Sequence, residues 1–129
     1  GVDMNRNFGY KWGYDNNGSS PVPSDNTYRG PAPFSEPEAQ AVSDLAILHN
    51  YGTHFNMHSY SDAYLYPWGY INQQCPDSLT YREFAGDMTA LNGYVLEPAE
   101  RFSVTNLMAL LEIGCTESRL TRIKYSDIH

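Results

Sequence analysis

The sequence predicts an α/β domain with a largely parallel sheet, because candidate strands and helices alternate along the chain. Two segments combine a helix-capping pattern with helical spacing of apolar residues, and a short apolar segment follows each of them. The length of 129 residues suits one ordinary domain with a hydrophobic core of its own. Alternation, capping and length together support this fold class.

The beginning of the chain predicts an anion site followed by one long loop. Asn5 and Arg6 stand between apolar and aromatic residues in the segment GVDMNRNFGYKWG, and an arginine at the mouth of a loop suits an anion. Residues 13–33 are rich in Gly, Pro, Ser and Asn and are expected to form a single loop. A loop of that length in a compact domain is usually either functional or disordered.

The first predicted helix lies in residues 35–52, SEPEAQAVSDLAILHNYG. Ser35 is its expected N-cap, with Glu38 completing a capping box and Pro37 in the first turn. Gly52 is expected to end the helix. Its apolar stripe recurs at mostly helical spacing and comprises Ala39, Val42, Leu45, Ala46 and Leu48.

A strand and a second helix are expected next. Residues 53–60, THFNMHSY, predict a buried strand, and the following segment SDAYLYPWGYINQQCP predicts a loop or a broken strand. The second helix is expected in residues 77–93, with Thr80 and Glu83 as a capping box and Gly93 at its end. Its expected apolar stripe comprises Leu79, Phe84, Met88 and Leu91.

The C-terminal part of the chain carries weaker patterns. Residues 93–98, GYVLEP, predict a short strand. Residues 103–115, SVTNLMALLEIGC, predict a third helix, and residues 122–128 predict another strand. Cys75 and Cys115 leave two interpretations open, a disulfide and two free thiols.

Charge and hydropathy exclude two classes of partner. Eight Lys and Arg against fifteen Asp and Glu give a net charge of −7, so no basic surface for nucleic acid or for an anionic membrane is expected. No apolar run reaches the roughly 18 residues that a membrane-spanning helix needs. No nucleic acid and no membrane is therefore expected among its partners.

Three segments, in this order, resemble the zinc metallocarboxypeptidases of the carboxypeptidase A type: GVDMNRNF, TYRGPAPFSEPEAQAV and MHSYSDAYLYPWGY. The resemblance runs from Gly1 to about Glu100, and residues 101–122 diverge from the family pattern. It implies that residues 1–129 are a single internal fragment of a catalytic domain. The implied fold is a partial, mixed, mainly parallel sheet with flanking helices. The implied protein is secreted and lies in an extracellular or periplasmic location.

The resemblance also assigns site residues. His58 matches a zinc ligand, and Asn5 and Arg6 match the pair that binds the C-terminal carboxylate of a substrate. A planar guanidinium suits that role because it contacts both carboxylate oxygens at once. Ser59 and Tyr60 match residues that line the substrate groove.

Each assignment has a structural alternative. His58 considered alone suits a structural histidine, Arg6 suits an ion pair with Asp3 or Asp15, and Ser59 and Tyr60 suit ordinary packing at a strand end. Asp3 is expected to orient its neighbours. His54 lies four residues before His58, but in a strand that spacing separates the two by about 13 Å, so His54 is expected to be structural.

The family's catalytic chemistry needs residues that this sequence does not contain. It has no His-x-x-Glu motif for the other two zinc ligands, which the resemblance places upstream of Gly1. The catalytic glutamate would fall just beyond His129. No catalytic residue is therefore assigned within the chain, and the isolated chain is expected to be inactive and to self-associate through open sheet edges.

The resemblance predicts a zinc-dependent carboxypeptidase that acts on peptide or protein C-termini. Two alternatives remain. One is a non-catalytic carboxylate-binding or scaffold module on the same fold. The other is an enzyme of the same fold that acts on small acyl-amino acids.

Overall fold

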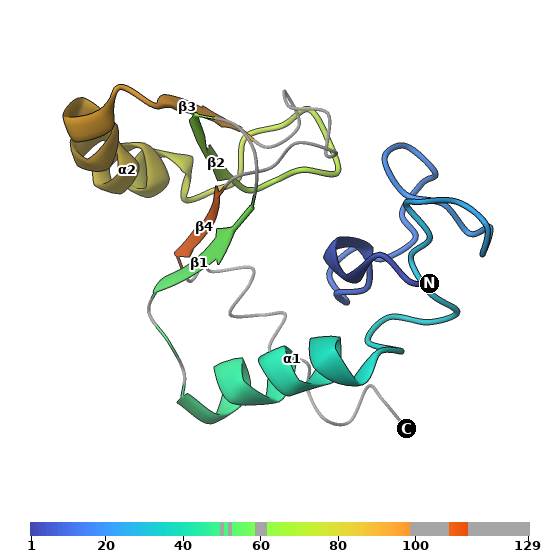
Figure 1. Cartoon of the computed structure of the whole chain (residues 1–129). Coiled ribbons are helices and arrows are strands. Elements are labelled where there is room, and N and C mark those ends of the chain that lie inside the picture. Colours follow the sequence, from blue (N-terminus) through green and yellow to red (C-terminus); the bar gives the residue numbers. More distant parts are fainter. Residues whose placement is uncertain (50, 52, 59–61, 99–108, 114–129) are drawn as a thin grey trace. The chain divides into compact units, whose positions relative to one another are not determined.

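The computed structural model describes residues 1–49, 51, 53–58, 62–98 and 109–113. The chain divides into two compact units, Gly1–Asn50 and Tyr51–His129. The first contains the 3-10 helix η1 (Met4–Arg6) and the helix α1 (Pro37–His49), and the second contains a sheet and the helix α2 (Ser78–Asn92) (Figure 1).

The first unit consists mostly of ordered loop. Tight turns are closed by backbone hydrogen bonds, and Ser20 and Tyr28 form an isolated parallel bridge within the predicted loop of residues 13–33. Gly30, with φ +87°, is buried at the end of this loop. A Cβ atom added there would lie 2.6 Å from Asn7 Nδ2, so both backbone conformation and space require glycine.

Helix α1 begins at Pro37, one residue later than an N-cap at Ser35 requires, and Ser35 makes other contacts than those of the expected capping box. The Ser35 hydroxyl donates to the Glu36 carboxylate at 2.9 Å, and the Glu36 backbone N–H donates to Asn7 Oδ1 at 3.1 Å. An asparagine 29 residues earlier in the chain therefore satisfies the amide before the helix. Of the predicted apolar stripe only Ala39 is buried, and Val42, Leu45, Ala46 and Leu48 are exposed.

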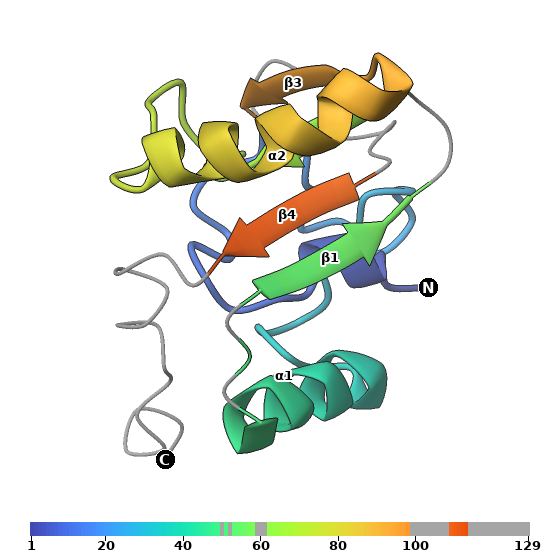
Figure 2. The ribbon, with the colours of Figure 1, turned by 90° about the vertical axis from the view of Figure 1, so that its left-hand side faces the viewer.

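The second unit contains a four-stranded mixed sheet with the order β1-β4-β2-β3, formed by β1 (Thr53–Met57), β2 (Ala63–Tyr66), β3 (Val95–Pro98) and β4 (Ala109–Ile113). The strand β4 pairs antiparallel with β1 and parallel with β2, and β2 pairs parallel with β3. Figure 2 shows β1 and β4 side by side with opposite directions. The predicted fold class, a partial and mainly parallel mixed sheet with helices, is confirmed.

Strand β1 confirms a strand in residues 53–57, but its described side chains are not buried as predicted. Phe55 is 38% exposed and Met57 is 75% exposed. The predicted broken strand contains β2, and the predicted short strand contains β3.

Helix α2 ends at Gly93 as predicted, in the left-handed conformation that favours glycine. Its start is one residue later than the predicted segment, and the Thr80–Glu83 capping box is wrong because the N-cap residue is Asp77. The predicted apolar stripe is also wrong, since Leu79, Phe84 and Leu91 are exposed. The buried face is formed by Ser78, Tyr81 and Ala85.

The core of the second unit is aromatic. The rings of Tyr66 and Tyr81 stack with centroids 5.9 Å apart, and Cys75 and Ala85 complete the buried cluster. Tyr64, Trp68 and Leu96 pack against it. Cys115 lies outside the described residues, so the choice between a disulfide and two thiols stays open.

Strand β4 contradicts the third predicted helix within residues 103–115, because residues 109–113 are extended and paired on both sides. A short apolar run has no periodicity that separates a buried strand from a helix. Residues 103–108, 114, 115 and the strand predicted at 122–128 lie outside the described part of the chain. None of the described helices is both long and apolar enough to cross a membrane.

Candidate functional site

Arg6, at the end of η1, has a guanidinium fixed by backbone carbonyls. Its Nε donates to the carbonyl of Gly18 at 2.5 Å, and its Nη1 donates to the carbonyl of Asn5 at 3.1 Å. The side chain is only 8% exposed, although it carries a charge. Such contacts restrict the plane in which the guanidinium lies, which is what recognition of a planar carboxylate requires.

The electrostatic surroundings of Arg6 combine two opposing effects. Burial lowers the pKa of the guanidinium from its ordinary value, and the nearby Asp3 carboxylate raises it in part. Asp3 Oδ2 lies 4.0 Å from Arg6 Nε. Arginine stays protonated at neutral pH in spite of such shifts, so a positive charge is maintained at this position.

Asp3 orders the short helix that presents Asn5 and Arg6. It is the N-cap of η1, and its carboxylate accepts a hydrogen bond of 3.0 Å from the backbone N–H of Asn5. This contact agrees with the expected orienting role of Asp3. The ion-pair alternative for Arg6 is also present, since Asp3 is the carboxylate beside it, so Asp3 both orients and partly balances the arginine.

His58 follows directly after β1 in the second unit. Its Nε2 atom is buried and has no hydrogen-bond partner among the described residues. A buried polar atom without a partner is costly, and native structures usually satisfy it with a protein group, a water molecule or an ion. The His58 imidazole therefore fits a role as one ligand of a metal ion.

The remaining predicted residues are distributed as follows. Ser59 and Tyr60 lie outside the described residues. His54 is exposed and lies within β1, where the extended backbone separates it from His58, so the strand assumption behind its structural role is confirmed. The structure brings Asn5 and Arg6 together in η1, and His58 belongs to the second unit.

The described residues contain no group of three His, Cys, Asp or Glu side chains that could hold a metal ion. The assignment of His58 as one zinc ligand stays a prediction. A catalytic zinc site usually has three protein ligands and one open position.

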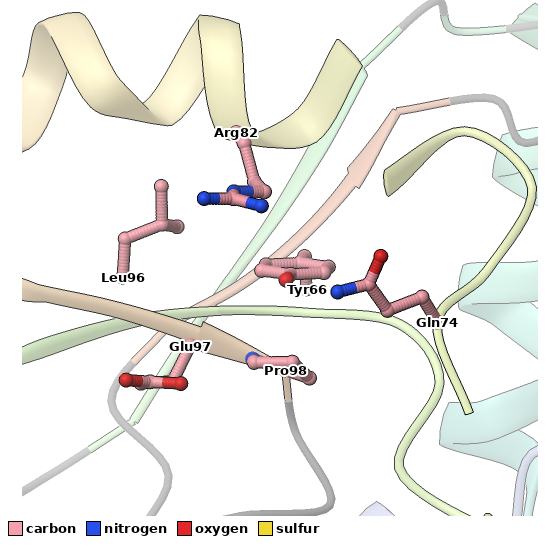
Figure 3. Close-up of a pocket in the computed structure, with 6 residues that line it drawn as sticks. All are labelled: Tyr66, Gln74, Arg82, Leu96, Glu97 and Pro98. Atoms are coloured by element: carbon pink, nitrogen blue, oxygen red, sulfur yellow. The ribbon is translucent and has the colours of Figure 1, made fainter. Parts of the chain in front are cut away.

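A cavity of about 200 Å³ lies in the second unit (Figure 3), and none of the described residues that line it is a predicted site residue. It is lined by Tyr66, Gln74, Arg82, Leu96, Glu97 and Pro98. Figure 3 shows the side chains of Arg82 and Gln74 directed toward Tyr66 from two sides.

Two residues that order the surroundings of Arg6 are absent from the sequence predictions. Asn7 is fully buried, and its amide bonds the carbonyls of Arg29 and Ala32 and the hydroxyl of Ser35. The Arg29 side chain contacts the loop that contains Gly18. Both residues lie in segments that carry the family resemblance, so the sequence could have marked them as candidates. Their hydrogen-bond partners could not be predicted from the sequence.

Comparison with known sequences gives consistent matches. The profile of peptidase family M14, the zinc carboxypeptidases, matches residues 1–113. Carboxypeptidase A5 of Homo sapiens is 38% identical over 88 residues, which cover 67% of this chain and 20% of that protein. Carboxypeptidase A1 of Rattus norvegicus is 37% identical over 98 residues, which cover 72% of this chain and 23% of that protein. The chain thus spans about a fifth of the length of these relatives.

Comparison with solved structures agrees with the family match from the sequence comparison. The crystal structure of thrombin activatable fibrinolysis inhibitor matches with a TM-score of 0.67 and 28% sequence identity, over 78% of this chain and 28% of that chain. The profile match covers residues 1–113, a range that includes Arg6 and His58. The chain therefore belongs to the zinc carboxypeptidase family.

Proposed function

We propose that the protein carrying this chain is a zinc-dependent carboxypeptidase that releases C-terminal residues from peptides. In this proposal the chain contributes His58 as a zinc ligand and Asn5 and Arg6 as the carboxylate-binding pair. The observation that carries the proposal is the buried Nε2 atom of His58, which has no hydrogen-bond partner among the described residues of a chain in this family.

His58 supplies an imidazole directly after the end of β1. The other zinc ligands and the general base come from parts of the protein outside this chain. Zinc, when bound, polarises the scissile carbonyl and lowers the pKa of a bound water molecule. The chain by itself is then inactive.

Arg6 restricts cleavage to the end of the substrate. Its guanidinium, ordered by Gly18 and Asn5, binds the free carboxylate of the last residue, and the Asn5 side-chain amide adds a second polar contact. The proposal also assigns substrate binding to Ser59 and Tyr60, on the ground of the family resemblance. An internal peptide bond offers no carboxylate to Arg6, so the substrates are peptide or protein C-termini.

The family membership supports two further parts of the proposal at a coarser level. The M14 relatives support a hydrolase that uses zinc, and an extracellular or periplasmic location is proposed on the same ground. The net charge of −7 supports partners other than nucleic acid or an anionic membrane.

The test is the release of a C-terminal amino acid by the whole protein that carries this chain. We expect it to cleave a peptide with a free C-terminus, to leave the C-terminally amidated peptide intact, and to lose at least about 100-fold in kcat/KM on His58→Ala. The matched control is His54→Ala, an exposed histidine on the same strand, which should retain activity.

Unchanged peptide cleavage in the His58→Ala protein would refute the metal role of His58. A whole protein that binds free-carboxylate peptides without cleaving them would support the non-catalytic carboxylate-binding module instead. Cleavage restricted to acyl-amino acids would support the other alternative, an enzyme of the same fold that acts on small acyl-amino acids.

A further inference from the structure

The Arg29 guanidinium contacts residues 15–19, which lie at least ten positions earlier in the chain. Its Nη1 atom lies 3.1 Å from the Asp15 carbonyl, 3.0 Å from Asn16 Oδ1 and 3.1 Å from Ser19 Oγ. Three acceptors around one nitrogen share its two protons, so the loop is fixed at several points by a single side chain. Residues 15–19 are thereby tied to the residue that precedes Gly30.

Packing restricts the Arg29 side chain further. Its guanidinium carbon lies 5.3 Å from the centroid of the Trp12 ring, within the range of a cation–π contact. Its Nε atom is buried and has no hydrogen-bond partner among the described residues. The guanidinium therefore lies against Trp12 and donates to three acceptors in residues 15–19.

The loop that Arg29 contacts is the loop that contacts Arg6. Gly18 lies between Asn16 and Ser19, and its carbonyl accepts the 2.5 Å hydrogen bond from Arg6 Nε. A displacement of this loop moves the acceptor that orients the Arg6 guanidinium. The side chain of Arg29 thus acts on Arg6 through the backbone of Gly18.

The main chain of Arg29 gives a second connection to Arg6. Its carbonyl accepts hydrogen bonds from Asn7 Nδ2 at 2.9 Å and from Trp12 Nε1 at 3.1 Å. Asn7 is the residue after Arg6 and is fully buried. Arg29 is therefore connected to Arg6 in two ways. Its carbonyl binds the neighbouring residue Asn7, and its side chain binds the loop whose Gly18 carbonyl accepts from Arg6.

We infer that Arg29 is a positioning residue for Arg6, acting through the 15–19 loop to set the orientation in which Arg6 binds the substrate's C-terminal carboxylate. The inference rests on the proposed function of Arg6. A two-point contact between guanidinium and carboxylate depends on orientation, and an error of about 1 Å in the position of a binding group costs up to about 100-fold in rate. Lysine replaces Arg29 poorly, because a strongly hydrated ammonium group does not reproduce the contact of the planar guanidinium with the Trp12 ring while it donates to residues 15–19.

The experiment compares variants of the whole protein on two peptides that differ only in a free or amidated C-terminus. For Arg29→Lys we expect KM for the free-carboxylate peptide to rise about tenfold and kcat to change less than about twofold. The preference for the free over the amidated peptide should fall in parallel. A merely structural role would lower the fraction of active protein, which reduces kcat and leaves KM and the preference unchanged.

A second variant protects the test against misfolding of Arg29→Lys. Replacing Asn16 and Ser19 by alanine removes two of the three acceptors of Arg29 Nη1 and leaves the arginine in place. It should raise KM in the same direction by a smaller factor. Arg82→Lys, at an exposed position on α2, is the matched control and should leave KM unchanged.

Arg6→Lys separates this inference from the proposed function. If Arg6→Lys leaves the preference for the free carboxylate intact, the carboxylate role of Arg6 is refuted. If Arg6→Lys removes that preference while Arg29→Lys and the double alanine variant keep the wild-type KM, the proposed function stands and the positioning role of Arg29 is overturned.

Discussion

Asn7 connects three segments of the first unit through one fully buried side chain. Its Nδ2 atom donates to the carbonyls of Arg29 and Ala32 and to Ser35 Oγ, and its Oδ1 atom accepts from the backbone N–H of Glu36. Each of these groups would be left without this partner if the amide were removed. The residue therefore determines how the long loop joins the start of α1.

We predict that Asn7→Ala destabilises the protein by about 2–4 kcal/mol, because buried polar groups lose their partners without access to water. The free energy of unfolding, measured by urea denaturation followed by circular dichroism, checks this value. Asn26→Ala, at an exposed position of the same loop region, should change it by less than about 0.5 kcal/mol. Equal effects of the two substitutions would contradict the role of Asn7.

At the scale of single residues, the sequence indicated the chemistry of side chains but not their hydrogen-bond partners. Arg6 and His58 could be singled out because their side-chain chemistry and motif suit an anion and a metal ion. Asn7 and Arg29 could not, because their roles depend on partners up to 29 residues away in the chain. The contact of the Glu36 N–H with Asn7 was not predictable for the same reason.

Helix α2 has one glycine in its interior and another at its C-cap, with opposite structural roles. Gly93 is the C-cap with φ +71° and donates its N–H to the Thr89 carbonyl at 2.8 Å, whereas Gly86 lies inside the helix. A Cβ atom at either position would meet no atom within 4 Å. Backbone conformation alone therefore distinguishes the two sites.

We predict opposite changes for the two alanine substitutions. Gly93→Ala should destabilise the protein by about 1 kcal/mol because alanine disfavours the left-handed conformation. Gly86→Ala should stabilise it by up to about 1 kcal/mol because alanine favours the helix interior. Thermal unfolding of the two variants beside the wild type measures the difference, and shifts of the same sign would contradict the assigned helix end.

At the scale of elements, the presence of α1 and α2 was predictable from the sequence, but the buried face of each helix was not. Capping glycine and local propensity located α2 correctly, but its apolar residues do not mark the buried face, which Tyr81 and Ala85 form. Strand β4 was mistaken for a helix because pairing with β1 and β2 is decided by segments far away in sequence. The buried face of α2 and the extended conformation of β4 both depend on tertiary contacts, which a single sequence does not reveal.

For the chain as a whole, the described sheet has β3 at one edge. Val95 begins this strand and is 50% exposed. An open edge strand favours pairing with another chain, so we predict that the isolated chain self-associates. A charged side chain on an edge strand opposes such pairing, so Val95→Lys should shift the isolated chain toward monomer.

Sedimentation velocity of the isolated chain over a range of concentrations measures this association. Leu91→Lys, which replaces the 91% exposed leucine of α2, is the matched control for removal of an apolar side chain. Association that disappears with Leu91→Lys and persists with Val95→Lys would show that an apolar surface, and not the sheet edge, is responsible. A wild-type chain that stays monomeric would refute the prediction entirely.

The overall fold class was predictable because alternating helices and strands, together with three ordered motifs, constrain it from many positions at once. The mixed sheet and the helix α2 that packs against it agree with that expectation. Within the candidate site, Asn5, Arg6 and His58 followed from the motifs, whereas the loop contacts that orient Arg6 followed only from the structure.

Zinc content tests the central claim most directly. The whole protein, and its His54→Ala variant, should retain about one zinc ion per molecule after dialysis against a weak chelator, as measured by mass spectrometry of the metal. The His58→Ala variant should lose the ion, with an affinity lower by at least about 100-fold. Retention of one zinc ion with unchanged affinity in His58→Ala would contradict the assignment of this chain's histidine to the metal.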